Sequence, residues 1–230
     1  MLISTLLHDI GIQAVFSEAL DGGVADENDH AASNRLCRSA HVPSPAQQCH
    51  QPHGASIWQV DGHSRTTGAD ILISNQTNLT LAIRTADCLP ILLADANTGT
   101  IAAVHAGWRG TAEGIVQRAI TAILKLGSTA EAIHAAMGPA IGNCCFMIGP
   151  KCHQQLAACA NGVGVTQTEH NWYADLASIN RYQMQNSGIS ADHIEQLGGC
   201  TCCQSNRFFS HRRDATQLRQ LALICRNLPS

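Results

Sequence analysis

The chain has 230 residues, of which 45% are hydrophobic and only 13% charged, and its formal net charge is −3. This length suits one large domain or two small ones, and the charged share is roughly half of the usual one. The sequence has no run of basic residues and no apolar stretch of about 18 residues, so we expect no nucleic-acid-binding surface, no anionic-membrane surface and no transmembrane helix.

The sequence before residue 56 indicates a few short elements and much loop. Residues 1–20 favour a short helix and a strand, and the polar stretch 21–55 favours a surface loop with one short helix around 34–39. After it, short apolar or β-branched runs alternate with turn signals such as DGHS, NQTN and DANTG, which is typical of strands. The predicted strands are 55–60, 69–74, 79–84, 91–95 and 99–107, with a hairpin around 97–99.

The second half of the chain mixes helices with strands. Apolar residues at helical spacing predict a helix over 110–127, which Thr111 can cap and Gly127 can end. This order of elements predicts one mixed α/β (α+β) domain. The remaining predicted elements are a strand at 133–139, helices at 150–160 and 173–188, and a last apolar run at 220–227.

The eleven cysteines and the N-terminus indicate the compartment. An odd number of cysteines, spread from Cys37 to Cys225, favours reduced thiols over a disulfide framework. The N-terminal sequence MLISTLLHDIGIQ has no basic leader and carries Asp9 within its apolar run, so we expect no signal peptide. We therefore predict a cytoplasmic protein. Its low charge is compatible with a self-association face, and we expect a monomer or a weak homodimer.

Four groups of cysteine and histidine residues compete as the functional site. They are Cys49, His50 and His53; Cys88 and His105; Cys144 and Cys145; and His193, Glu195, Cys200, Cys202 and Cys203.

The last two groups favour structural interpretations. The fourth resembles a zinc deaminase signature, but only four residues separate Glu195 from Cys200 and no proline precedes that cysteine. Cys200 and Cys203 have the C-x-x-C spacing of a structural zinc site, which needs a second pair, so we interpret them as part of a buried thiol cluster. We interpret Cys144 and Cys145 as packing residues, because neighbouring side chains diverge on a strand or helix. No His–X–His or His–Cys–His cluster occurs, so we expect no intrinsic multicopper centre.

The second group is the best candidate for chemistry. Cys88 follows Asp87 at the end of a predicted strand, and His105 precedes the glycine-rich turn AGWRG, in which Arg109 offers an anion or oxyanion donor. Residues that end adjacent strands can converge at one sheet edge. From the residues alone, Cys88 can be a nucleophile, a metal ligand or a buried thiol. His105 can be structural or functional, and Arg109 can bind a local carboxylate or a substrate.

Five ordered motifs carry a resemblance to a known family. QPHG, RTADCLPILLAD, AAVHAGWRGTAEGI, GPAIGNCCF and CTCCQSNRFFSHRRD together resemble the YfiH/laccase-domain family, also called the polyphenol oxidase or purine nucleoside phosphorylase family. The resemblance runs from about residue 51 to the C-terminus, and residues 1–50 are divergent. It implies a single layered α/β/β/α domain over residues 1–230, similar to the catalytic domain of cytotoxic necrotizing factor.

The resemblance also implies a metal site and an activity. His53, Cys88 and His105 match the family's ligands for one zinc ion, with copper as the other metal ascribed to the family. The implied activity is phosphorolysis of purine nucleosides (adenosine, inosine, guanosine and methylthioadenosine) together with adenosine deamination. Two imidazoles and one thiolate leave the fourth zinc position open, which is typical of catalytic zinc, and zinc lowers the pKa of bound water to about 7.

Phosphorolysis also needs residues that move a proton and residues that hold the phosphate. Asp87 could orient a ligand or move a proton, and Arg84, Arg109 or Arg213 could hold the phosphate. The chain departs from the family pattern near Glu18, where Thr-Arg is usual, and this leaves substrate choice and activity open. Further departures are Met147, which stands where an acid is common, and the missing glycine after Asp214.

The leading hypothesis is a zinc-dependent purine nucleoside phosphorylase with adenosine deaminase activity. Three alternatives remain. One is a copper-dependent phenol oxidase. Another is a metal-free cysteine hydrolase or amidase, with Cys88 as thiolate, His105 as base and a cell-wall precursor as substrate. The last is a metal-binding module whose catalysis is impaired.

Overall fold

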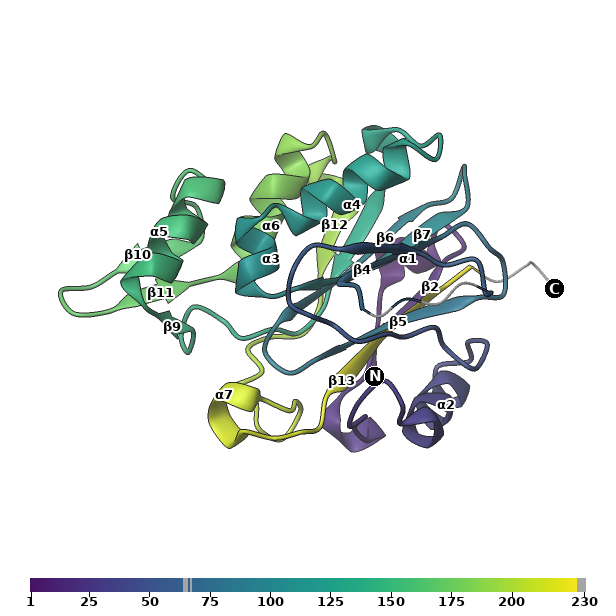
Figure 1. The fold of residues 1–230 in the computed structure, drawn as a ribbon, viewed down its shortest axis with the longest axis horizontal. Helices are drawn as coiled ribbons and strands as arrows, with labels where there is room; N and C mark the ends of the chain where they lie inside the picture. Colours follow the sequence, from purple (N-terminus) through teal and green to yellow (C-terminus); the bar gives the residue numbers. More distant parts are fainter. Residues whose placement is uncertain (64–65, 67, 227–230) are drawn as a thin grey trace.

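The computed structural model describes residues 1–63, 66 and 68–226, and its elements form four layers (Figure 1). The strands are β1 (Leu2–Ile3), β2 (Gln13–Phe16), β3 (Ile57–Gln59), β4 (Ile71–Ser74), β5 (Thr80–Thr85), β6 (Leu89–Asp95), β7 (Thr100–Ala106), β8 (His134–Met137), β9 (Met147–Ile148), β10 (Val165–Gln167), β11 (Trp172–Ala174), β12 (Ile194–Gln196) and β13 (Gln220–Cys225). The α-helices are α1 (Thr5–His8), α2 (His30–Ser39), α3 (Trp108–Ala112), α4 (Ile115–Leu124), α5 (Pro150–Cys159), α6 (Leu176–Asn186) and α7 (His211–Asp214). Short 3₁₀ turns cover Ala19–Asp21, Ala130–Ala132 and Ala191–His193.

Two sheets pack face to face at the centre of the molecule. The larger sheet has six strands in the order β12-β8-β6-β7-β4-β3, with parallel pairs only at its two ends, β12 with β8 and β3 with β4. The smaller sheet has four antiparallel strands in the order β1-β2-β13-β5. Helices α3, α4 and α6 cover the outer face of the larger sheet (Figure 1), and α2 covers the smaller one. These layers are the α/β/β/α arrangement, so the expectation of a mixed α/β fold is confirmed.

Burial of both sheet faces explains the uninterrupted apolar runs in the sequence. On β6, Ile91 and Leu93 join the core under the helices, whereas Leu92 and Ala94 join the core between the sheets. Alternate residues of a strand point to opposite faces, so a strand buried on both faces reads as a continuous run. On β13 the same alternation divides the residues between the sheet–sheet core and the core beneath α2.

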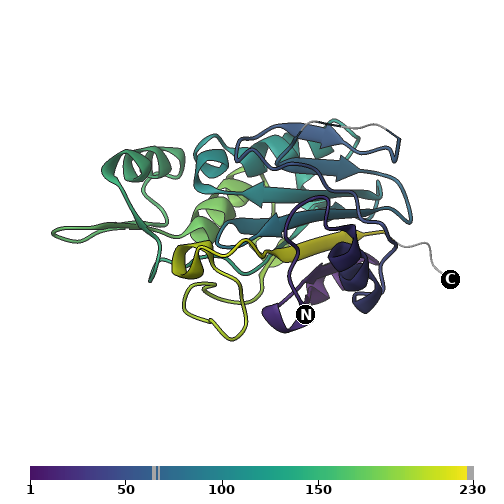
Figure 2. The same ribbon diagram turned by 60° about the horizontal axis from the view of Figure 1, so that its bottom comes forward.

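A small three-stranded sheet, β10-β11-β9, extends from this core together with α5 (Figure 1). Figure 2 shows β13, in yellow, running beside the purple N-terminal segment that contains β2. Among the described residues, no helix is long and apolar enough to cross a membrane.

Several predicted elements are confirmed with shifted ends. β6 and β7 form the expected hairpin, in which Asp95 pairs with Thr100. The expected strand at 133–139 is β8, the helix at 150–160 is α5 and the run at 220–227 contains β13, although residue 227 lies outside the described residues. The helix expected around 34–39 begins earlier, after Asp29, whose carboxylate accepts a hydrogen bond from the N–H of Ala32.

Two helix predictions are wrong, one because the helix is broken and one because it begins later. The helix expected over 110–127 is two helices, α3 and α4, because Gly114 between them has a left-handed φ of 73°. Thr111 therefore lies inside α3 and caps nothing, although Gly127 does follow the end of α4. The helix expected at 173–188 begins only at Leu176, because Asp175 caps it and Tyr173 belongs to β11.

Candidate metal centre

Three potential ligands from separate segments converge beside the larger sheet. His53 lies in the loop before β3, Cys88 immediately precedes β6, and His105 lies near the end of β7, where it pairs with Pro90. One ligand atom from each residue lies within 4.8 Å of the others. His105 is almost completely buried, whereas the His53 side chain is exposed, so the cluster has one side open to solvent.

Asp70 holds both histidine segments and was not identified from the sequence. This carboxylate is fully buried immediately before β4, and its Oδ1 lies 2.8 Å from Nδ1 of His105. It also accepts hydrogen bonds from the backbone N–H groups of His53, at 3.0 Å, and Gly54, at 2.7 Å. With Nδ1 of His105 facing the carboxylate, Nε2 is the atom left for a ligand bond. A carboxylate behind a metal-binding histidine in this way orients the ring and raises its basicity.

The backbone before Cys88 is held in an unusual conformation. Asp87 has a φ of 95°, a left-handed value that costs free energy for a residue other than glycine. Its carboxylate accepts hydrogen bonds from the Thr201 hydroxyl and the Arg212 N–H, each at 2.6 Å, and its carbonyl accepts one from the N–H of Ile141. These contacts hold the turn that aims Cys88 at the two histidines.

Gly107 leaves the room that the cysteine sulfur occupies. A Cβ at this position would lie 3.2 Å from Sγ of Cys88 and 3.6 Å from the His53 ring. The glycine of the HAGWRG motif therefore permits close approach of ligands, in addition to beginning α3.

Cys88 and His105 form a charged pair in the absence of a metal. Burial opposes ionisation of Cys88, but the charge of His105 and hydrogen bonds with both histidines outweigh it and lower the pKa of the thiol to about 6. Burial likewise opposes charging of His105, but the Cys88 thiolate and Asp70 outweigh it and raise its pKa to about 9. A thiolate is the form of cysteine that binds metals, so the metal-free site already holds the ionised ligand at neutral pH.

His53, Cys88 and His105 line a cavity of about 450 Å³. Its wall carries charged side chains from the N-terminal loops, from the end of β5 and the turn after it, from α7 and from the residue before β13. The charged or titratable residues on the wall, besides the three ligands, are Asp26, Glu27, His50, Arg84, Asp87, His211, Arg212 and Arg219. This volume is in the range of cavities that hold small molecules.

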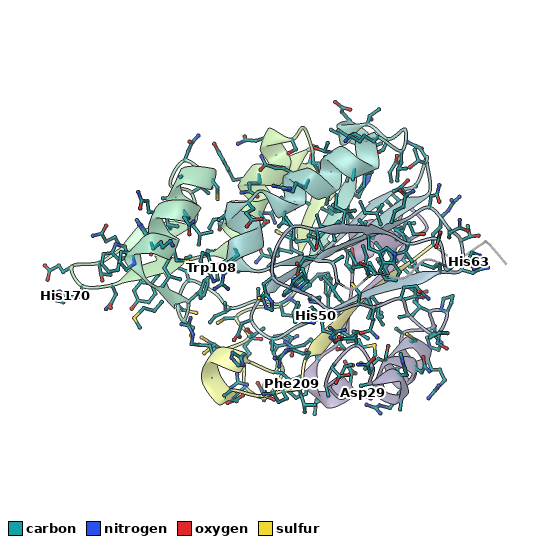
Figure 3. The ribbon with its side chains drawn as sticks, in the orientation of Figure 1. Asp29, His50, His63, Trp108, His170 and Phe209 are labelled. Carbon is teal, nitrogen blue, oxygen red and sulfur yellow. The ribbon has the colours of Figure 1, made fainter. Side chains whose placement is uncertain are left out.

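Only some of the other predicted site residues line this cavity. Arg84 and Asp87 do, and the guanidinium of Arg84 is bound to Glu27 at 3.0 Å. Arg109 stacks on Trp108 and lines a separate hollow between α3 and α5. Figure 3 labels Trp108, which lines this hollow, apart from His50, which lines the cavity at the three ligands. The guanidinium of Arg213 is occupied by three backbone carbonyls and by Asp214.

The competing cysteine and histidine groups are arranged differently from the sequence interpretation. His193 stacks on His134, and Glu195 accepts hydrogen bonds from Ser4 and Thr5, so neither residue joins the cysteines that follow them. Cys145 packs against the core beneath the helices, as expected, but the side chains of Cys144 and Cys145 do not diverge, because residues 142–146 form a turn in place of a strand or helix. Their sulfurs instead lie with those of Cys200 and Cys203, and this thiol cluster is partly exposed where burial was predicted.

A layered α/β/β/α fold with a two-histidine, one-cysteine donor set at the floor of a cavity defines a candidate metalloenzyme. The chain belongs to the family described as multi-copper polyphenol oxidoreductase laccase, whose sequence profile matches residues 11–227.

Named relatives cover most of the chain. It is 33% identical to a purine nucleoside phosphorylase of Xylella fastidiosa, over 93% of this chain and 87% of that protein. It is 30% identical to the Escherichia coli purine nucleoside phosphorylase YfiH, over 96% and 91%. A shorter match, 34% identical over 64% of this chain and 57% of the relative, is with adenosine deaminase RL5 from an unknown prokaryotic organism.

Solved structures have the same fold. The crystal structure of YlmD from Geobacillus stearothermophilus superposes with a TM-score of 0.85 at 27% identity, covering 98% of this chain and 94% of that one. The structure of the Bacillus licheniformis protein YfiH superposes with a TM-score of 0.80 at 24% identity, covering 93% and 92%. The resemblance inferred from the five motifs is thereby confirmed.

Proposed function

We propose that this chain is a zinc-dependent purine nucleoside phosphorylase that also deaminates adenosine, with the metal held by His53, Cys88 and His105. The observation that carries the proposal is the convergence of these three donors, within 4.8 Å of one another, on the floor of a small-molecule-sized cavity. The names of relatives that align over most of the chain support the choice of substrate class.

The donor set suits zinc. Two imidazoles and a thiolate match the ligands of three-coordinate catalytic zinc sites, and the exposed side of His53 leaves an approach to a fourth position. Zinc bound there would supply Lewis acidity to a substrate in the cavity. Asp70 would keep the ligating histidine in one tautomer, and the strained turn at Asp87 would hold the cysteine in place.

The cavity wall supplies groups for an anionic co-substrate. Of the arginines predicted to bind phosphate, Arg84 lines the cavity, and we add Arg212 as a second candidate. Nη1 of Arg212 donates to the carbonyls of Cys145 and Met147, which leaves its Nη2 and Nε for a ligand. Changing Arg212 to Met should raise the KM for phosphate about tenfold or more with a smaller change in the KM for nucleoside. Arg118→Met, on the outer surface of α4, is the matched control.

The decisive assay follows both reactions in one sample. Purified holoprotein is incubated with adenosine, inosine, guanosine or methylthioadenosine, with and without phosphate, and the products are separated by chromatography. Phosphate-dependent release of the free base with the sugar 1-phosphate (ribose 1-phosphate, or 5-methylthioribose 1-phosphate from methylthioadenosine) supports phosphorolysis. Phosphate-independent formation of inosine from adenosine supports deamination. Both activities should be lost in Cys88→Ala and kept in Cys152→Ser. Failure of the metal-loaded protein on every nucleoside refutes the proposal.

Two alternative activities have a specific observation in their favour, and the same samples test them. The family description favours phenol oxidation, which requires dioxygen uptake that depends on copper. The thiolate–imidazolium pair of Cys88 and His105 favours a cysteine hydrolase, which requires activity in metal-free protein and its loss on alkylation of Cys88.

A further inference from the structure

A second set of potential metal ligands lies outside the candidate centre. The sulfurs of Cys144, Cys145, Cys200 and Cys203 all lie within 4.8 Å of one another. Sγ of Cys203 is 3.4 Å from Sγ of Cys144 and 3.3 Å from Sγ of Cys145. All four are free thiols, and none of them takes part in the site formed by the two histidines and Cys88.

We propose that these four cysteines bind one zinc ion as a structural tetrathiolate site. Zinc–sulfur bonds of about 2.3 Å at tetrahedral angles place neighbouring sulfurs about 3.8 Å apart, so the observed cluster needs only a small expansion to accept the ion. Cys200 and Cys203 supply the C-x-x-C pair that structural zinc sites use, and Cys144 and Cys145 supply the second pair. The inference does not depend on the proposed enzymatic function.

The two turns that carry the cysteines are built to face each other. Residues 142–146 form one turn, in which the carbonyl of Gly142 accepts hydrogen bonds from Cys145 and Phe146. The second turn is closed by a bond from the N–H of Gln204 to the carbonyl of Cys200. A parallel bridge between Ala140 and Cys200 joins their bases, with the N–H of Thr201 donating to the carbonyl of Ala140 at 3.0 Å.

Gly142 gives the cluster both space and a hydrogen bond. A Cβ at this position would lie 3.3 Å from Cβ of Cys200, which is a tight contact, and would touch Sγ of Cys144 at 3.5 Å, so a larger residue would crowd the backbone that carries the cluster. Its N–H donates to Sγ of Cys200 at 3.2 Å. Hydrogen bonds from backbone N–H groups to thiolates stabilise negative charge on sulfur, which is the state that a bound cation requires.

A disulfide fits these positions less well than a metal. Cys203 is almost equally distant from Cys144 and Cys145, so the geometry selects neither of them as its partner. A disulfide would also use only two sulfurs and leave the other two thiols unpaired. A single cation satisfies all four at once, and tetrahedral coordination by four sulfurs is characteristic of zinc.

The proposed site braces one wall of the candidate active-site cavity. Phe146 is the last residue of the first turn and lines the cavity. Arg212, which also lines it, donates to the carbonyl of Cys145 and stacks on Phe146 at 5.4 Å. Thr201, inside the second turn, donates to Asp87. Zinc in the cluster would not itself touch the substrate. It would fix the positions of residues that line the substrate cavity.

Elemental analysis of full-length variants tests the proposal. Protein purified under reducing conditions with zinc should hold about two zinc ions per chain in the wild type and in Cys152→Ser, and about one in Cys88→Ala and in the double variant Cys144→Ser/Cys203→Ser. Loading Cys88→Ala with Co²⁺ should produce the strong sulfur-to-cobalt absorption of a tetrathiolate site. That absorption should be absent when Cys144→Ser and Cys203→Ser are added.

The outcomes separate this site from the proposed enzymatic one. Zinc retained by Cys88→Ala supports the tetrathiolate site whether or not any nucleoside is turned over. Absence of zinc from that variant, unchanged zinc in the Cys144/Cys203 variant, iron or copper recovered in its place, or a disulfide within the cluster overturns the proposal. If the double variant does not fold, alkylation mapped by mass spectrometry in Cys88→Ala decides, because zinc must protect all four cysteines and leave Cys152 unaffected.

Discussion

Replacing Asp70 with Asn tests whether this buried carboxylate supports the metal centre. The side chain accepts three hydrogen bonds, at 2.8, 3.0 and 2.7 Å, from the His105 ring and from the backbone of His53 and Gly54. An amide of the same shape keeps one oxygen, so at least one of these donors faces an NH₂ group, and the negative charge behind the histidine is lost. Removing such support typically weakens metal binding by about 10- to 100-fold, or about 1.4 to 2.7 kcal/mol.

The measurement is the dissociation constant of zinc, from competition with a chromophoric chelator, alongside thermal unfolding of the metal-free protein. In the Asp70→Asn variant, the donor that faces the NH₂ group loses its acceptor, which should also lower the free energy of unfolding by about 1–3 kcal/mol. Asp95→Asn is the matched control, since Asp95 is equally buried but binds only the turn between β6 and β7. The reasoning is refuted if the folded Asp70 variant binds zinc within about twofold of wild type, or if the control weakens binding as much.

Three further predictions, one from pH and two from substitutions, concern the residues in and around the site. In metal-free protein, the rate of alkylation of Cys88 should be half-maximal near pH 6, the pKa of its thiol, and constant above neutral pH. The reason is that the thiolate is lost only as the pH falls through that value. A midpoint above pH 8 contradicts the proposed ion pair. Gln51→Ala should lower the free energy of unfolding by about 1–3 kcal/mol, since its side chain bonds both the N–H and the carbonyl of Arg84; unchanged denaturant midpoints would be inconsistent with this. Gly107→Ala should weaken zinc binding about tenfold by crowding the sulfur. Gly149→Ala should not, because among the described residues only its own chain neighbours come within 4 Å of the added methyl group.

Motifs in the sequence predicted which three residues share a site, because each lies in a short stretch that resembles a family pattern. The sequence could not identify Asp70, whose contact with His105 depends on β4 lying beside β7 in one particular register. That register is set by packing between the sheets and helices, and a single sequence does not display it.

The thiol cluster was misread for a related reason. The expectation that Cys144 and Cys145 diverge is sound for a strand or a helix, but the chain turns at Gly142. Their partners lie more than fifty residues away and are brought close by the bridge between Ala140 and Cys200. The break between α3 and α4 was missed because continuous helical spacing of apolar residues outweighed the signal from one glycine, Gly114.

The central position of β13 constrains how the protein is made. β13 lies between β2 and β5, and residues bonded across this sheet, such as Ser17 and Leu221, are 204 positions apart in the chain. At about 5–20 residues per second, a ribosome needs about 10–40 s to travel that distance. From its own synthesis until β13 emerges, each of β2 and β5 has one strand edge without its β13 partner, which is the kind of surface that joins to other chains. We therefore expect the nascent chain to be prone to aggregation until β13 emerges, and loss of β13 should yield aggregates in place of a weakened enzyme.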